Sequence, residues 1–107
     1  MNRDALEKIA DAIAEECIED YVGLWVLLKE TSRAFPEASA SELQDMTLEV
    51  VRELLNRGSV VAGDLSSEDR FCNWRLSTDH TVARVHEEWE RLGHEPNIAD
   101  IVWFTAP

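Results

Sequence analysis

Residues 39–65 read SASELQDMTLEVVRELLNRGSVVAGDL, the pattern of a capped helix that leads into a short strand. Ser39 and Glu42 have the spacing of a capping box, in which each side chain accepts a hydrogen bond from the other residue's backbone. Gly58 is typical of the left-handed residue that follows a helix end. Residues 59–65 then suit a short strand with a bend at its Gly-Asp step. The apolar face of the predicted helix, Ser41–Arg57, consists of Leu43, Met46, Thr47, Val50, Val51, Leu54 and Leu55.

Upstream of this stretch, helical spacing of apolar residues predicts two further helices, Asp4–Ile18 and Tyr21–Ala34. Asp20 is the expected N-cap of the second one, and Phe35-Pro36 ends it, because a residue before proline avoids helical geometry. The second helix is apolar almost all round, so we expect it to be the most buried element. The alternative is one long bent helix from Asp4 to Ala34.

Downstream, FCNWRL (residues 71–76) alternates like a half-buried strand and would form a hairpin with residues 59–65. Ser77 or Thr78 caps a helix over Asp79–Leu92, and residues 101–104 read as a last short strand. The fold class predicted is therefore α+β and mainly helical, in one domain over residues 1–107. It has three N-terminal helices, a small antiparallel sheet of two or three short strands, and one further helix.

Three helices followed by a hairpin resemble the element order of a winged helix. In DNA-binding winged helices, the third helix enters the major groove with its outward side chains against the bases. The outward side of Ser41–Arg57 instead carries twice as many acids as bases: Glu42, Asp45, Glu49 and Glu53 against Arg52 and Arg57. Phosphate would repel such a face, so little or no DNA binding is expected.

The C-terminal part also resembles an uncharacterised family of small acidic bacterial proteins. The resemblance is carried by DLSSED at residues 64–69, FCNW at residues 71–74, EEWERLGHEP at residues 87–96 and NIADIVWF at residues 97–104. It covers about residues 20–105. It implies a shared fold, and it carries over no catalytic residue, because that family has none assigned.

Charge is the strongest compositional signal, since 22 acidic residues against 10 basic ones give a formal net charge of −12. This imbalance excludes a general nucleic-acid binder and a polybasic membrane-surface module. The longest uncharged apolar run, residues 21–28, is far shorter than the ~20 residues of a membrane span. Cys17 and Cys72 form no metal or disulfide signature, and Cys17 falls on an apolar helix face. A reduced, soluble, cytoplasmic protein is expected.

No pattern in the sequence predicts an enzyme, a cofactor or a metal site. His86 and Glu90 lie in a near miss to HExxH, in which glutamate replaces the second histidine, and two ligands on one helix face are too few for zinc. Cys72 or Ser77 could be a nucleophile with His80 nearby. Catalytic partners need to converge in space, and closeness in sequence does not show this.

The candidate functional residues are therefore those of a docking surface for a protein partner, which we expect to be basic. Small bacterial immunity proteins that neutralise basic nuclease toxins have a similar size and charge. The alternative is a winged-helix-like regulator or adaptor that forms a homodimer. Tryptophans on short strands are candidate interface anchors. The candidate partner-binding residues are Glu15, Glu16, Glu19, Asp20, Trp74, Glu87, Glu88, Glu90 and Trp103.

Overall fold

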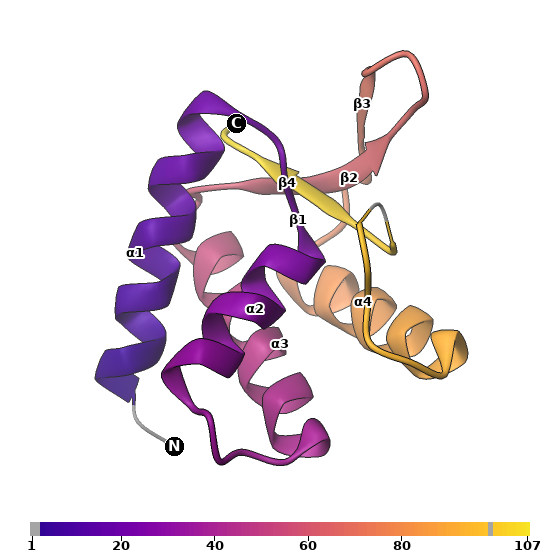
Figure 1. Cartoon of the computed structure of the whole chain (residues 1–107). Coiled ribbons are helices and arrows are strands. Elements are labelled where there is room, and N and C mark those ends of the chain that lie inside the picture. The colour runs from indigo at the N-terminus through magenta and orange to yellow at the C-terminus, as the bar shows by residue number, and fades with distance from the viewer. Residues whose placement is uncertain (1–2, 99) are drawn as a thin grey trace.

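The computed structural model confirms the α+β class and the predicted order of the helices (Figure 1). It describes residues 3–98 and 100–107, and over these residues the chain forms four helices and one four-stranded sheet. The elements are α1 (Arg3–Glu19), β1 (Val22–Gly23), α2 (Leu24–Ala34), α3 (Ala40–Asn56), β2 (Val61–Leu65), β3 (Phe71–Asn73), α4 (Thr78–Leu92) and β4 (Trp103–Thr105).

Local signals set the ends of α3 as predicted. Ser39 Oγ accepts a hydrogen bond from the Glu42 backbone N–H at 3.1 Å, and Glu42 Oε1 accepts one from the Ser39 N–H at 2.9 Å. The bond from the Ser39 backbone lowers the pKa of the Glu42 carboxyl, because it favours the charged form. After the helix, Gly58 has φ +70°, the left-handed geometry that glycine adopts most easily.

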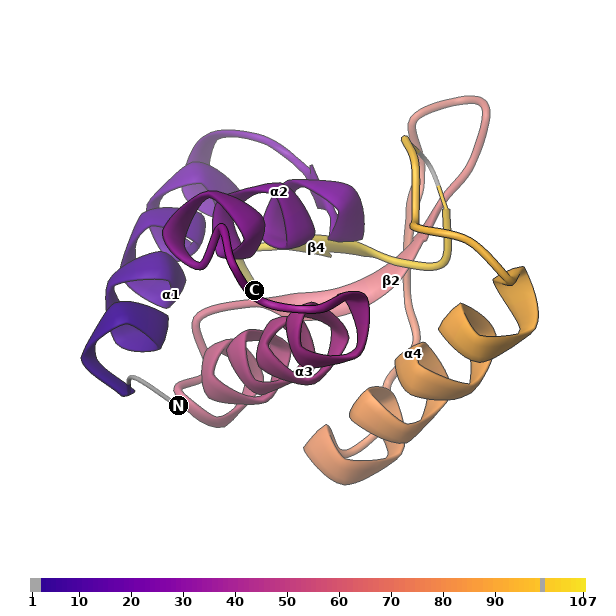
Figure 2. The ribbon, with the colours of Figure 1, turned by 60° about the horizontal axis from the view of Figure 1, so that its bottom comes forward.

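The central helix is α3, and the expectation that residues 21–34 are the most buried element stays a prediction, because the two segments bury a similar share of their residues. α3 packs against α1, α2 and α4, and Figure 2 shows it between α1 and α4 below the sheet. α2 lies at the side of this arrangement, where Trp25 and Val26 remain partly exposed. The apolar residues all round α2 were therefore not a sign of full burial. α3 buries Leu43, Met46, Thr47, Leu48, Val50, Val51 and Leu54.

The junction between the first two helices also differs from the prediction. Asp20 does not cap a helix, because Val22 and Gly23 form strand β1 and α2 begins only at Leu24, with Gly23 as its N-cap. The Asp20 carboxylate accepts a hydrogen bond from the Tyr21 N–H at 2.8 Å instead. The alternative of one bent helix is wrong for the same reason. A strand interrupts the helical pattern here because Val22 pairs with Phe104, a residue far away in the sequence.

The sheet has four strands in the order β1–β4–β2–β3, each antiparallel to its neighbours, where two or three strands were predicted. The C-terminal strand β4 thus lies between β1 and β2 and joins them. Strands β3 and β4 are shorter than predicted. β3 ends at Asn73, two residues before Arg75 with φ +57°, and β4 begins after Ile101 with φ +69°. A left-handed residue cannot continue a strand.

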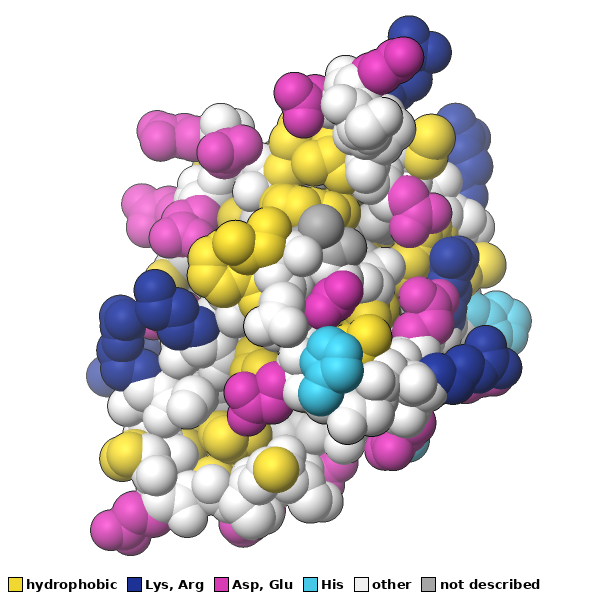
Figure 3. All heavy atoms as spheres, turned by 45° about the vertical axis from the view of Figure 1, so that its right-hand side comes forward, with side chains coloured by type: hydrophobic (Ala, Val, Ile, Leu, Met, Phe, Trp, Pro, Cys, Tyr) yellow, Lys and Arg dark blue, Asp and Glu magenta, His cyan; other side chains and the backbone are white. Residues whose placement is uncertain are grey.

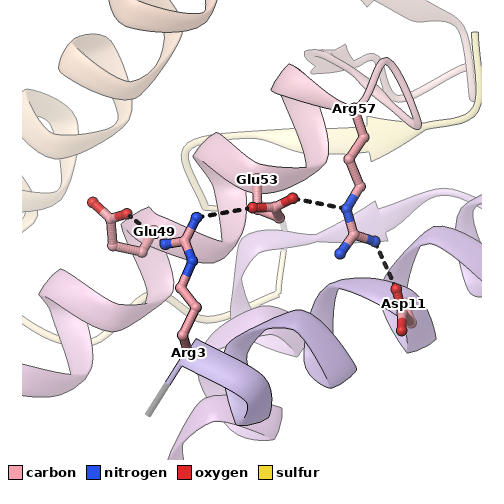
Figure 4. Close-up of polar contacts among 5 residues, drawn as sticks. All are labelled: Arg3, Asp11, Glu49, Glu53 and Arg57. Carbon is pink, nitrogen blue, oxygen red and sulfur yellow. Dashed lines mark hydrogen bonds and ion pairs between the residues drawn. The ribbon is translucent and has the colours of Figure 1, made fainter. Parts of the chain in front are cut away.

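A chain of ion pairs fastens the first part of α1 to α3 (Figure 4). Arg57 donates to Asp11 Oδ1 at 2.6 Å and to Glu53 Oε2 at 2.9 Å, and these bonds raise the pKa of its guanidinium. Arg3 lies 3.2 Å from Glu53 Oε1 and 3.8 Å from Glu49 Oε2. The pairs are partly exposed, so each contributes little stability. They do offset the charges of Asp11, Glu49 and Glu53.

One buried hydroxyl gives a test of the packing of α3. The Thr47 side chain is 0% exposed, and its Oγ1 has no hydrogen-bond partner in the described part of the chain. Thr31 is equally buried, but its Oγ1 donates to the Leu27 carbonyl at 2.7 Å. Because an unsatisfied buried polar group destabilises the fold, Thr47→Val should raise the free energy of unfolding by about 1 kcal/mol.

Thr31→Val is the matched control, and it should lower the free energy of unfolding because it removes a hydrogen bond that is made. Urea denaturation of the wild type and the two variants measures both changes. A destabilised Thr47→Val variant would contradict the prediction.

Candidate functional site

The two faces of the sheet have different surroundings. Val22, Ala62 and Phe104 are buried in the core shared with the helices, and they lie opposite one another in the strand register. Successive side chains along a strand point to opposite faces. The next residues on the same three strands, Gly23, Gly63 and Trp103, therefore share the other face.

Two glycines on this outer face leave room for aromatic rings. Gly23 and Gly63 are the register partners of Trp103 on its two sides. A Cβ atom on Gly23 would come within 2.8 Å of the Trp25 ring, and one on Gly63 within 2.7 Å of the Phe71 ring and 2.2 Å of the Cys72 carbonyl oxygen. Larger residues at either position would displace a ring or the neighbouring strand.

Three half-buried aromatic residues make up what we call the aromatic face: Tyr21, Phe71 and Trp103. The rings of Tyr21 and Phe71 stack, with their centroids 5.7 Å apart and an angle of 14° between their planes. Phe71 comes from β3, so this stack joins the hairpin to the start of β1. In Figure 3, hydrophobic side chains gather below the tip of the β2–β3 hairpin, with acidic side chains to their left.

Next to this face in the chain is the acidic end of α1, which we define as Glu15, Glu16, Glu19 and Asp20. All of these residues are exposed, and within the described ranges none of them takes part in an ion pair. Ile18 lies among them with 73% of its surface exposed. Asp20 directly precedes Tyr21, so the acidic end of α1 leads into the aromatic face along the chain.

A backbone hydrogen bond to Ala106, the residue after β4, holds the acidic end of α1 in place. The Cys17 carbonyl accepts a hydrogen bond from the Ala106 N–H at 3.1 Å, and Figure 1 shows the end of α1 beside the end of β4. Cys17 itself is buried, as predicted. Burial raises the pKa of its thiol to about 12, and the negative charge of Glu16 adds to the shift.

The acidic residues of α4, unlike those at the end of α1, lie beside basic side chains. Glu87 pairs with Arg91 at 2.6 Å and Glu88 with Arg84 at 2.7 Å. Glu90 lies 3.3 Å from His86. Figure 2 shows α1 and α4 on opposite sides of α3, so the structure does not bring the two predicted acidic clusters together.

The two candidate tryptophans also differ. The Arg84 guanidinium lies over the Trp74 ring, 3.7 Å from its centroid, and Trp74 packs against the core. A side chain of the same protein therefore already covers Trp74. Trp103 is half-buried beside glycines and belongs to the aromatic face.

Of the side chains considered for catalysis, Ser77 has a structural role. Ser77 Oγ accepts a hydrogen bond from the His80 N–H at 3.1 Å and so caps α4, as predicted. Cys72 is exposed. In the described part of the chain, no group of three or more histidine, cysteine, aspartate or glutamate side chains is arranged to hold a metal ion. A shallow cavity of about 570 Å³ between α2 and residues 95–98 contains one lysine, Lys29, and one glutamate, Glu95.

Sequence reasoning missed Ile18, Tyr21 and Phe71. Ile18 could have been found, because it falls off the apolar stripe of its helix and among four acids. The stack of Tyr21 on Phe71 joins residues far apart in the chain, and no sequence pattern announces it.

No family model, curated protein or solved structure matches this chain. The resemblance of residues 20–105 to small acidic bacterial proteins therefore stays a prediction. Among residues 3–98 and 100–107, no helix is both long enough and apolar enough to cross a membrane.

The two thiols should report whether the end of α1 stays docked on β4. Cys72 is exposed and should react quickly with DTNB, whereas the buried Cys17 thiol, with its raised pKa, should react only after unfolding. Absorbance should show one equivalent released from the native protein and a second after guanidinium is added. The Cys72→Ser variant should release none while folded. Fast release from native Cys72→Ser would show that the end of α1 opens.

Proposed function

We propose that this chain is an acidic protein-binding module whose partner is a basic protein. The observation that carries the proposal is the acidic end of α1, whose four exposed carboxylates form no ion pair within the described ranges and directly precede Tyr21 of the aromatic face in the chain. A carboxylate that is paired with a cation exerts only a weak electric field on a partner protein, because the cation cancels most of its charge. The carboxylates at the end of α1 keep their full electric field, and such a field speeds the encounter with a cationic surface.

The specific form of this proposal is an immunity-type role, in which the module neutralises a basic toxin. The formal net charge of −12 on 107 residues supports it, because an excess of negative charge steers a basic protein and repels nucleic acid. The acidic end of α1 is the preferred docking surface. The α4 cluster is a weaker candidate because its glutamates are paired.

The second candidate is a winged-helix-like regulator or adaptor that acts through protein contacts as a homodimer. The element order supports it, since a hairpin follows the third helix and β1 precedes the second. A DNA-reading role gains no support, because a recognition helix must present one side to the groove. α3 packs against three other helices, and its Glu49 and Glu53 are the acceptors of Arg3.

Charge reversal at the two acidic clusters distinguishes a docking surface from a merely solvated one. Glu16→Lys with Glu19→Lys should slow association with the basic partner about tenfold and flatten its salt dependence, because the steering field is removed. Glu87→Lys with Glu88→Lys is the matched control, with the same charge change on paired residues. Affinity capture at low and high salt supplies the partner, and stopped-flow kinetics measure the rates.

The α1 double variant should fold with nearly unchanged stability, since Glu16 and Glu19 are exposed and such substitutions usually change it by less than ~0.5 kcal/mol. The α4 double variant loses two ion pairs at helical spacing, so its stability should fall slightly. Equal association rates for wild type and both variants would contradict the docking surface and leave solubility as the role of the acidic residues. A larger effect of the α4 variant would move the docking surface to α4.

Duplex DNA should not bind at physiological salt, because the protein has no net positive charge to release counterions. Fluorescence anisotropy of a labelled random duplex checks this. Salt-sensitive binding with a Kd of ~1–100 μM, the range of non-specific DNA binders, would contradict it.

A further inference from the structure

We propose that the aromatic face and the acidic end of α1 form one site, which binds an arginine-rich segment of the protein partner. The inference rests on the proposed function, and it adds which side chain is recognised and where. Its two parts are the rings of Tyr21, Phe71 and Trp103 and the exposed carboxylates that precede Tyr21 in the chain.

The rings are suited to a flat cation. Beside Trp103, the rings of Trp25 and Phe71 lie against Gly23 and Gly63, and the rings of Tyr21 and Phe71 lie nearly parallel at 14°. A planar guanidinium stacks on such ring faces, and the attraction between a cation and a π system adds to the contact. The molecule itself provides an example, because Arg84 lies 3.7 Å from the centroid of the Trp74 ring.

The carboxylates supply the second half of the recognition. A guanidinium on the aromatic face still has N–H groups in its plane, and these need acceptors. Asp20 and Glu19 precede Tyr21 directly, are exposed and have no ion pair in the described ranges. Carboxylates accept a guanidinium through two parallel hydrogen bonds, which a lysine ammonium cannot make. Stacking and pairing together therefore favour arginine over lysine.

Charge also selects among possible occupants of this face. A second copy of the chain would bring another acidic end of α1 against the first, and like charges repel across an interface. Nucleic-acid bases stack on aromatic rings as well, but their phosphates would meet the same carboxylates. A basic protein segment satisfies both the rings and the charge.

Calorimetric titration of the full chain with nona-arginine and nona-lysine peptides tests the inference, since the two peptides carry the same charge. Nona-arginine should bind with a Kd at least about threefold lower, from stacking at one or more rings. Binding of both peptides should weaken as salt increases. This comparison uses the wild-type protein, so it does not depend on any variant folding.

Substitutions then test which side chains produce the preference for arginine over lysine. Tyr21→Ala and Phe71→Ala should each reduce the preference for arginine while leaving the affinity for nona-lysine nearly unchanged. Trp74→Ala is the matched control, because it also removes a half-buried ring, but one that Arg84 already covers. Glu16→Lys with Glu19→Lys should weaken both peptides together. Circular dichroism melts verify that each variant is folded.

The outcomes separate this inference from the proposed function. Equal affinity of the wild type for the two peptides overturns the inference and leaves a purely electrostatic docking surface intact. Absence of binding by either peptide at low salt overturns both. A dimer in sedimentation analysis that disappears in Tyr21→Ala would assign the face to a second copy and also overturn the inference.

Discussion

The pairing of β4 with both β1 and β2 is the interaction on which the rest of the structure depends. Phe104 is fully buried between its register partners Val22 and Ala62, so one side chain joins strands from the beginning, middle and end of the chain. The residue that follows this strand, Ala106, donates a hydrogen bond to the Cys17 carbonyl and so holds the end of α1. Without β4, neither the acidic end of α1 nor Trp103 would have a fixed place.

The helices were predictable because their signals are local. Ser39 with Glu42, and Gly93 with φ +74°, define helix ends within a few residues, and both are found as expected. β1 was not predictable, because Val22 and Gly23 form a strand only through a partner far along the chain. The same limit applies to the order of the strands. Propensity cannot reveal a pairing that depends on distant residues.

The candidate site shows the same division. Arg84 with Glu88, and Glu87 with Arg91, were readable as pairs four residues apart on α4, and the structure contains them. The acids at the end of α1 have no such cations at helical spacing, so their unpaired state was implicit in the sequence. The stack of Tyr21 on Phe71 was not, because it joins β3 to the start of β1 through the pairing of distant strands.

The central position of β4 sets an order of events during synthesis. β1, β2 and β3 leave the ribosome before β4, and β1 has no neighbour in the sheet until β4 arrives. A lone β2–β3 hairpin is only marginally stable in water. The helices α1, α2 and α3 can meet earlier, because all three precede β4 in the chain and pack against one another. The nascent chain therefore carries a helical cluster with an unfinished sheet, and the surface around Trp103 is assembled last.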